Sequence, residues 1–151
     1  MDPYAFHLNK IHWQFFGTLS FIGEPKSLPI ARSMLFRVFR KVARRNRIYF
    51  PELPWCLRHE LGKKFGRAHL HILLAGLPSE GVTEEECRHI ERTWRSGGGG
   101  IAKVQIFNPA LNGVGYLTKG LGEDCQNLML SHAVDLILRE RAYVTERRLA
   151  Q

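Results

Sequence analysis

The chain has 151 residues, 44% of them hydrophobic, and a formal net charge of +8 at pH 7. This composition argues against a disordered chain, and no apolar run approaches the roughly 18 residues that span a bilayer, which argues against a membrane protein. The positive charge favours a polyanionic partner, and nucleic acid is preferred over a membrane surface because no basic amphipathic anchor or lipidation signal stands out. The length predicts one domain over residues 1–151.

The first half of the chain predicts a strand, a long helix and a hairpin. Aromatic and β-branched residues between His12 and Ile22 are typical of a strand. Ser27 can cap a helix over 28–45, with Pro29 in its first turn and apolar residues at helical spacing after it. Two more strands are expected over 55–61 and 68–75, joined by the glycine-bounded turn of residues 62–66.

The second half predicts two helices and a strand, followed by a long closing helix. The T-x-x-E sequence at 83–86 is a capping box that opens a helix through about Trp94. We expect a flexible loop over the glycines of 97–100, a strand over 102–107, a short helix over 115–121 and a long helix over 123–148. The order β-α-β-β-α-β-α-α predicts an α+β fold, a central antiparallel sheet with helices mainly on one face.

Basic residues gather in two parts of the predicted fold. One group lies on the later turns of the first long helix, where it forms either a solvated face or a phosphate-binding surface: Arg37, Arg40, Lys41 and Arg44. A second group lies in or beside the hairpin turn: Lys63, Lys64 and Arg67. Binding of a nucleic acid through these groups would release counterions, so it is expected to weaken with salt.

Two histidines interrupt an otherwise apolar strand. His69 and His71 are two residues apart, so they point to one face of the sheet while their apolar neighbours point to the other. The pair fits either two structural histidines or a metal site, since neighbouring imidazoles on one strand are close enough to share an ion. Other residues of the sequence are needed to distinguish these two interpretations.

Glu60 is the residue that favours a metal. It lies near the end of the preceding strand, where an antiparallel neighbour could bring it beside the histidines. Two imidazoles and a carboxylate would hold a divalent ion and leave positions open for an oxygen-rich substrate such as a phosphodiester. The alternative is an exposed charge that balances the basic residues of the turn.

Tyr116 and Lys119 are a second pair with chemical potential. They are three residues apart, so a helix places them on one face. A tyrosine hydroxyl with a pKa near 10 is a poor nucleophile at neutral pH, but a divalent ion and a nearby ammonium group would make its attack on phosphorus plausible. The alternative is a packed tyrosine next to a solvated lysine.

Taken together, these motifs resemble those of the HUH endonucleases, the superfamily of rolling-circle replication initiators and their relatives. The sequence FFGTLSF at 15–21 is similar to the family's first, hydrophobic and Thr-containing motif. His69-Leu70-His71 matches the His-hydrophobic-His motif, Glu60 matches the upstream carboxylate, and Tyr116 with Lys119 matches the third motif. The resemblance covers about Trp13 to Leu121, with the parts in the same order and spacing.

This resemblance implies a ferredoxin- or RRM-like nuclease domain that nicks single-stranded DNA at a hairpin-associated origin. It implies that Tyr116 attacks the scissile phosphate, forms a 5′-phosphotyrosine link and later reverses the reaction, with Lys119 assisting. It also implies that Glu60, His69 and His71 hold Mn²⁺ or Mg²⁺. The remaining tyrosines lack a lysine partner, so one catalytic tyrosine is expected.

The chain departs from many viral initiators because it contains no GxxxxGK[ST] phosphate-binding loop. No helicase domain is therefore expected in this chain, and unwinding and synthesis would come from a host helicase and polymerase. Three widely spaced cysteines without a CxxC pair predict reduced thiols. We expect a cytoplasmic location in a bacterial host, or a nuclear one for an element of a eukaryotic virus.

Two other functions fit parts of the same pattern. A binding module for single-stranded nucleic acid on the same sheet, without catalysis, explains the charge and predicts no covalent product. A two-histidine, one-carboxylate iron oxygenase uses the same ligand types. However, one histidine usually lies far downstream in such oxygenases. The net positive charge of this chain would also have no role in an oxygenase.

Overall fold

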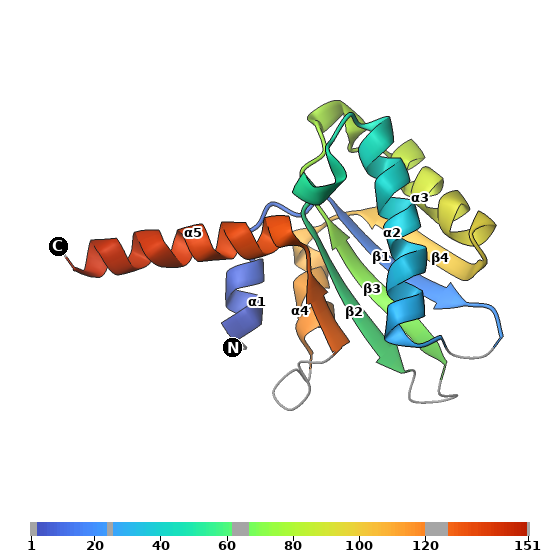
Figure 1. Ribbon diagram of the computed structural model, residues 1–151, viewed down its shortest axis with the longest axis horizontal. Coiled ribbons are helices and arrows are strands. Elements are labelled where there is room, and N and C mark those ends of the chain that lie inside the picture. Colours follow the sequence, from blue (N-terminus) through green and yellow to red (C-terminus); the bar gives the residue numbers. More distant parts are fainter. Residues whose placement is uncertain (1–2, 24–25, 62–66, 120–126, 151) are drawn as a thin grey trace.

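The computed structural model describes residues 3–23, 26–61, 67–119 and 127–150. Within these residues the centre of the molecule is a five-stranded antiparallel sheet with the order β4-β1-β3-β2-β5 (Figure 1). The strands are β1 (Phe15–Phe21), β2 (Trp55–Leu61), β3 (Ala68–Leu74), β4 (Gly99–Ile106) and β5 (Leu128–Leu130). This arrangement confirms the predicted α+β fold with a central antiparallel sheet.

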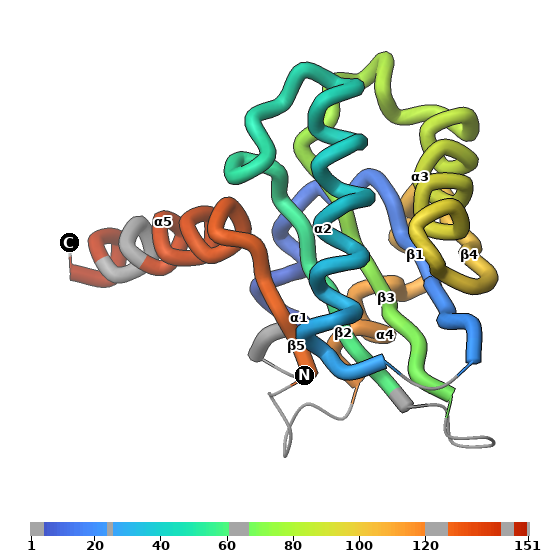
Figure 2. Tube along the Cα trace, turned by 45° about the vertical axis from the view of Figure 1, so that its right-hand side comes forward, coloured from blue at the N-terminus to red at the C-terminus, as the bar shows by residue number. Residues whose placement is uncertain are grey.

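Helices α2 (Leu28–Arg45) and α3 (Glu84–Ser96) cover one face of the sheet (Figures 1 and 2). The apolar stripe of α2, which includes the buried Leu35, Val38 and Phe39, packs on that face together with Ile90 and Trp94 of α3. Alternate strand residues meet this stripe: Phe15, Leu19, Leu57, Leu70, Ile72 and Leu74. The alternation predicted for β3 is therefore confirmed, because its apolar set faces the helices and leaves the histidines on the other side.

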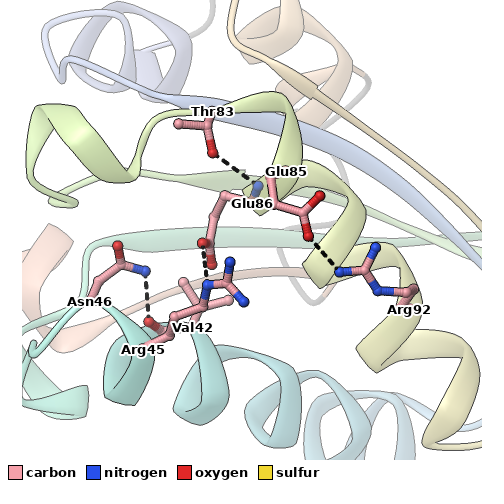
Figure 3. Close-up of polar contacts among 7 residues, drawn as sticks. All are labelled: Val42, Arg45, Asn46, Thr83, Glu85, Glu86 and Arg92. Atoms are coloured by element: carbon pink, nitrogen blue, oxygen red, sulfur yellow. Dashed lines mark hydrogen bonds and ion pairs between the residues drawn. The ribbon is translucent and has the colours of Figure 1, made fainter.

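Polar contacts join α2 to α3 at one end of the pair (Figure 3). Thr83 caps α3 as predicted, since its hydroxyl oxygen accepts a hydrogen bond from the Glu86 N–H over 3.1 Å. The Glu86 carboxylate, which a capping box would turn back toward the cap, instead lies 3.1 Å from the Arg45 guanidinium on α2. Beside it, Arg92 donates to Glu85 over 2.7 Å.

The opposite face carries a second apolar cluster at one end of the sheet. It is formed by α1 (Pro3–Leu8), α4 (Gly113–Thr118) and the first turns of α5 (His132–Leu149). Leu8, Val114, Leu117 and Val134 pack there against the strands. The part of this face beyond the cluster carries the two histidines. Beyond its packed first turns, α5 projects away from the sheet (Figure 1).

Three short elements depart from the predicted pattern. The sequence predicted no helix at the N-terminus, where α1 lies, and the expected helix over 115–121 begins earlier, at Gly113. The long helix expected over 123–148 is wrong in its first described part, because residues 128–130 form β5 and pair with Cys56, Leu57 and Arg58 of β2. The helix begins only after Ser131, whose hydroxyl accepts from the N–H groups of Val134 and Trp55.

The glycine run at 97–100 is also more ordered than the sequence predicted. β4 begins at Gly99, and a side chain at this position would overlap the indole of Trp94. Trp94 is buried and donates to the Ser20 carbonyl over 2.8 Å. The turn into the strand is made at Gly98, whose φ of +94° suits glycine.

Two structural findings bear on the expected environment of the protein. Cys56 and Cys87 are buried free thiols, while Cys125 lies outside the described residues. Among the helices that the structure describes, none combines the length and the apolar character that crossing a bilayer requires.

Short 3₁₀ turns at Phe50–Glu52, Ser79–Gly81 and Pro109–Leu111 complete the described elements.

Candidate metal centre and its tyrosine

Strand register brings Glu60 to the two histidines. β2 and β3 are antiparallel, with Glu60 opposite His69 and Arg58 opposite His71. Side chains opposite one another in such a pair project from the same face. The three predicted ligands therefore share the sheet face that α2 and α3 leave uncovered.

The carboxylate of Glu60 lies between the two imidazoles. Its Oε2 atom is 3.2 Å from Nε2 of His71 and 3.7 Å from Nε2 of His69. One potential ligand atom from each residue lies within 4.8 Å of the others. This separation is close to what a single divalent ion needs, because its bonds to nitrogen and oxygen are about 2 Å long.

His71 is the most constrained member of this cluster. Its Nδ1 lies 3.2 Å from the Thr18 hydroxyl on β1, and its ring stacks against Phe16 with centroids 6.0 Å apart. Burial lowers the pKa of His71, and the neighbouring His69 lowers it further against the opposing effect of Glu60. A neutral imidazole whose Nδ1–H donates to Thr18 presents its Nε2 lone pair toward Glu60, which is the arrangement of a metal-binding histidine.

The donor set fits a divalent cation. Two imidazole nitrogens and one carboxylate oxygen are common ligands of first-row metals, and three ligands leave positions for water or substrate oxygens. Mg²⁺ prefers sites made almost entirely of oxygen, so the two nitrogens favour Mn²⁺ of the two ions implied by the sequence.

Tyr116 lies on α4 beside this cluster. The centroid of its ring is 6.0 Å from that of His71 and 6.1 Å from that of Phe16. Its side chain is 54% exposed, so the phenol can meet a ligand from solution. A residue on a separate helix, 45 positions beyond His71 in the sequence, is thereby brought to the edge of the candidate metal site.

Lys119 follows the last turn of α4 and lies in the same hollow as Tyr116. It is the exposed C-cap residue, with φ −57° and ψ 122°, rather than a helical residue as the sequence predicted. The hollow has a volume of about 440 Å³, and its walls include Leu111, Asn112 and Gly115. A phosphate in this hollow would meet both an ammonium group and a phenol.

The predicted DNA-binding residues are placed less uniformly. Arg37, Arg40, Lys41 and Arg44 are exposed on α2, which covers the face of the sheet opposite to the candidate metal site. The guanidinium of Arg40 also lies 5.1 Å from the ring centre of Phe50. Arg67 precedes β3 and lines a hollow with Ser20 and Ala68, at the end of β3 that carries His69. Lys63 and Lys64 lie outside the described residues.

Sequence reasoning missed a row of polar residues that crosses four strands next to the candidate metal site. Lys103 of β4 pairs with Thr18 of β1, Thr18 pairs with His71, and His71 pairs with Arg58 of β2. Ala102 and Val104 are buried against the helices, so the exposed Lys103 projects from the histidine face. The alternation of Ala102, Lys103 and Val104 in the sequence indicated which way Lys103 faces. The sequence did not indicate the strand order that joins Lys103 to the rest of the row.

Comparison of this chain with known protein families, with curated proteins and with solved structures found no match. Any assignment of function therefore depends on the site itself: three residues that could hold a metal ion, a partly exposed phenol beside His71 and a lysine in the same hollow as that phenol.

Proposed function

We propose that this chain is a metal-dependent endonuclease that nicks single-stranded DNA and rejoins it, with Tyr116 as the nucleophile. The observation that carries the proposal is the 6.0 Å separation between the rings of Tyr116 and His71. A structural role for each residue separately gives no reason for an exposed tyrosine to lie beside His71, which in turn contacts Glu60 and His69. A site for transfer of a phosphodiester gives a reason for all four.

The proposed reaction exchanges one phosphodiester bond for another. The phenol oxygen of Tyr116 forms a bond to phosphorus and loses its proton, while the bond from phosphorus to the 3′ oxygen breaks and that oxygen takes up a proton. The product is a 5′-phosphotyrosine and a free 3′-hydroxyl. Because the phosphodiester energy is retained in the covalent link, attack by a 3′-hydroxyl reverses the step and joins the strands.

Each residue of the cluster has a separate task in this scheme. Glu60, His69 and His71 would hold a divalent ion, Mn²⁺ or Mg²⁺, which supplies Lewis-acid polarisation of a phosphate oxygen. Lys119 would favour the phenolate form of Tyr116 and balance the negative charge that develops on the phosphate. The Thr18 hydroxyl would accept a hydrogen bond from Nδ1–H of His71, which would leave the Nε2 lone pair for the ion.

This activity would serve the start of rolling-circle replication or the mobilisation of a genetic element. In such a role the DNA partner is a single-stranded origin beside a hairpin, and a host helicase and polymerase act on the 3′ end that the nick releases. The formal net charge of +8 supports a nucleic-acid partner through counterion release.

The test is capture of the covalent intermediate. The protein is incubated with Mn²⁺ and a pool of single-stranded oligonucleotides that have a randomised centre beside a hairpin and a label at the 3′ end. The 3′ part of a nicked strand stays on the tyrosine, so a labelled band of protein mass is expected on a denaturing gel. The band should be absent when a chelator replaces Mn²⁺.

Two variants identify the nucleophile. Tyr116→Phe removes the phenol oxygen and should abolish the labelled band. Tyr49→Phe is the matched control, because Tyr49 is 70% exposed but lies next to α2, away from the candidate metal site. A band that survives in Tyr116→Phe would mean that another residue is the nucleophile.

The alternative is a binding module for single-stranded nucleic acid on the same sheet. The exposed basic residues favour it as much as they favour the nuclease, since both need a positively charged surface. It predicts salt-sensitive binding of the oligonucleotide pool and no labelled band with the wild-type protein under any metal condition. Absence of the band in Mn²⁺ and in Mg²⁺ would therefore favour this function over the proposed one.

A further inference from the structure

Arg58 lies beneath α4, in the row of residues next to the candidate metal centre. Its strand neighbours are His71 on β3 and Leu128 on β5, and it lies two residues before Glu60 on the same face. Its Nη1 atom donates to the carbonyl oxygens of Leu117 and Lys119, with 3.1 Å to the first of them. Both carbonyls belong to the C-terminal end of the helix that carries Tyr116.

Helix α4 needs such a contact because it is too short to hold its own position. It has six residues, and a helix of this length gains little from its internal hydrogen bonds. The last carbonyls of any helix lack internal partners and form its negative end. A guanidinium supplies donors and a positive charge at that end, and an uncharged side chain could not supply both.

Apolar packing alone does not fix where α4 places its tyrosine. Val114 and Leu117 bury one side of the helix against Leu73 and Cys56. Contacts of this kind are non-directional, so they allow a short helix to slide or turn by a fraction of an ångström. The hydrogen bonds from Arg58 are directional, so they are able to set the position of α4 along its axis.

Every hydrogen bond that the structure gives the Arg58 guanidinium within the described residues is directed to this helix end. Its Nε atom is buried and has no hydrogen-bond partner among the described residues. The group is therefore anchored by the strand on one side and by α4 on the other.

We propose that Arg58 is a positioning residue that holds Tyr116 at the metal centre by gripping the carbonyl oxygens at the end of α4. This inference rests on the proposed function, because it assigns the grip to the nucleophile of that reaction. A displacement of about 1 Å at a reacting group can slow an enzyme by about 100-fold. The grip is therefore expected to control the rate of covalent attack without binding metal or DNA itself.

Two variants and two measurements test this role. Arg58→Met keeps the apolar stem and removes all donors, and Arg58→Lys keeps a charge and a shorter donor group. Amide hydrogen exchange over residues 113–118 reports directly on α4, and the rate at which the labelled adduct forms in a single turnover reports on Tyr116. Calorimetry with Mn²⁺ reports on the metal site in each variant.

In Arg58→Met we expect faster exchange in α4 and unchanged exchange in α2 and α3. We also expect adduct formation to slow by about 10- to 100-fold and Mn²⁺ affinity to stay within about twofold of the wild type. Arg58→Lys should recover part of the rate and part of the protection. Wild-type exchange in α4 together with a slowed adduct would overturn the positioning role, because Arg58 would then act on the substrate directly.

The outcome is separable from that of the proposed function. If the wild-type protein forms no adduct, the proposed function fails, while the exchange measurement still decides whether Arg58 holds α4. If the wild type forms the adduct and Arg58→Met forms it within about twofold of the same rate, the positioning role fails and the proposed function stands. If Arg58→Met does not fold, Arg58→Lys decides by the same two criteria.

Discussion

His71 is the residue through which the candidate site is most tightly connected. It faces Glu60 through Nε2, Thr18 through Nδ1 and Tyr116 through its ring. We predict that His71→Ala weakens Mn²⁺ binding by at least about 100-fold, because removal of a ligand should cost more than the 10- to 100-fold that accompanies loss of a ligand's supporting partner. Isothermal titration calorimetry of the wild type and the variant measures this change directly.

His59 offers a matched control from the neighbouring strand. Its Nε2 lies 3.1 Å from the Lys26 carbonyl oxygen, and the alternation of β2 directs it away from Glu60. His59→Ala should therefore bind Mn²⁺ with wild-type affinity. An unchanged affinity in His71→Ala would remove this histidine from the ligand set and leave the cluster one ligand short.

For single residues, the sequence predicted the features that alternation along one strand determines. The common face of His69 and His71 depends only on the two-residue period of a strand. The sequence did not predict the placement of Arg58 or the contact of Thr18 with His71, because both depend on which strands are neighbours and in which register. Pairing of this kind depends on packing across the whole sheet, so one strand's residues do not specify it.

The contact between α2 and α3 gives a prediction about pH. Burial raises the pKa of the Glu86 carboxyl above its usual value of 4.5, and the attraction of Arg45 only partly opposes this effect. The folded protein therefore binds the Glu86 proton more tightly than the unfolded chain does. Between pH 4.5 and the raised pKa, ionisation of Glu86 reduces the free energy of unfolding as the pH rises.

Replacement of Glu86 removes this titration. We expect the melting temperature of the wild type, measured relative to Glu86→Gln, to fall as the pH is raised from about 4 through this window, and to level off above it. Arg45 is 46% exposed, so it stays hydrated when its charged partner is lost. Thermal melts of both proteins at matched ionic strength between about pH 4 and 8 measure the difference.

Glu85 provides a control with the opposite sign. Hydrogen bonding and attraction from Arg92 lower the pKa of the Glu85 carboxyl. Its contribution to stability is present above the usual carboxyl pKa and is lost as the pH falls through the lowered value. The melting temperature of the wild type, measured relative to Glu85→Gln, should therefore rise as the pH rises. If the melting temperature relative to each variant changed in the same direction with pH, the raised pKa of Glu86 would be contradicted.

Elements were predicted well where a periodic pattern ran long enough to be distinctive. The bounds of α2 and β2 agree with the sequence, because 18 residues at helical spacing and seven strand-forming residues leave little ambiguity. α1 and β5 were missed because six and three residues carry no readable period. β5 exists through its pairing with β2, which is a property of the sheet and not of its own sequence.

On the scale of the molecule, the sheet separates two basic surfaces. One is the exposed side of α2, where the sequence predicted phosphate contacts. The other includes the exposed Lys103 on the histidine face and Lys119 at the end of α4, which lines the same hollow as Tyr116. Under the proposed function, a short DNA strand bound at the candidate metal centre would contact the second surface. The first lies across the whole thickness of the sheet and its helices, so it can meet only DNA that extends around the edge of the molecule.

The salt dependence of binding distinguishes these surfaces. For a single strand of about 12 nucleotides, each neutralised phosphate contributes about 0.7 to the slope of log K against log salt. We expect Lys103→Ala to reduce the slope by about 0.7, measured by fluorescence anisotropy in the Tyr116→Phe background so that no adduct forms. The double variant Lys41→Ala/Arg44→Ala removes two charges from α2 and should leave the slope unchanged. A reduction of about 1.4 in the double variant, with none in Lys103→Ala, would place the strand on α2 and contradict binding across the histidine face.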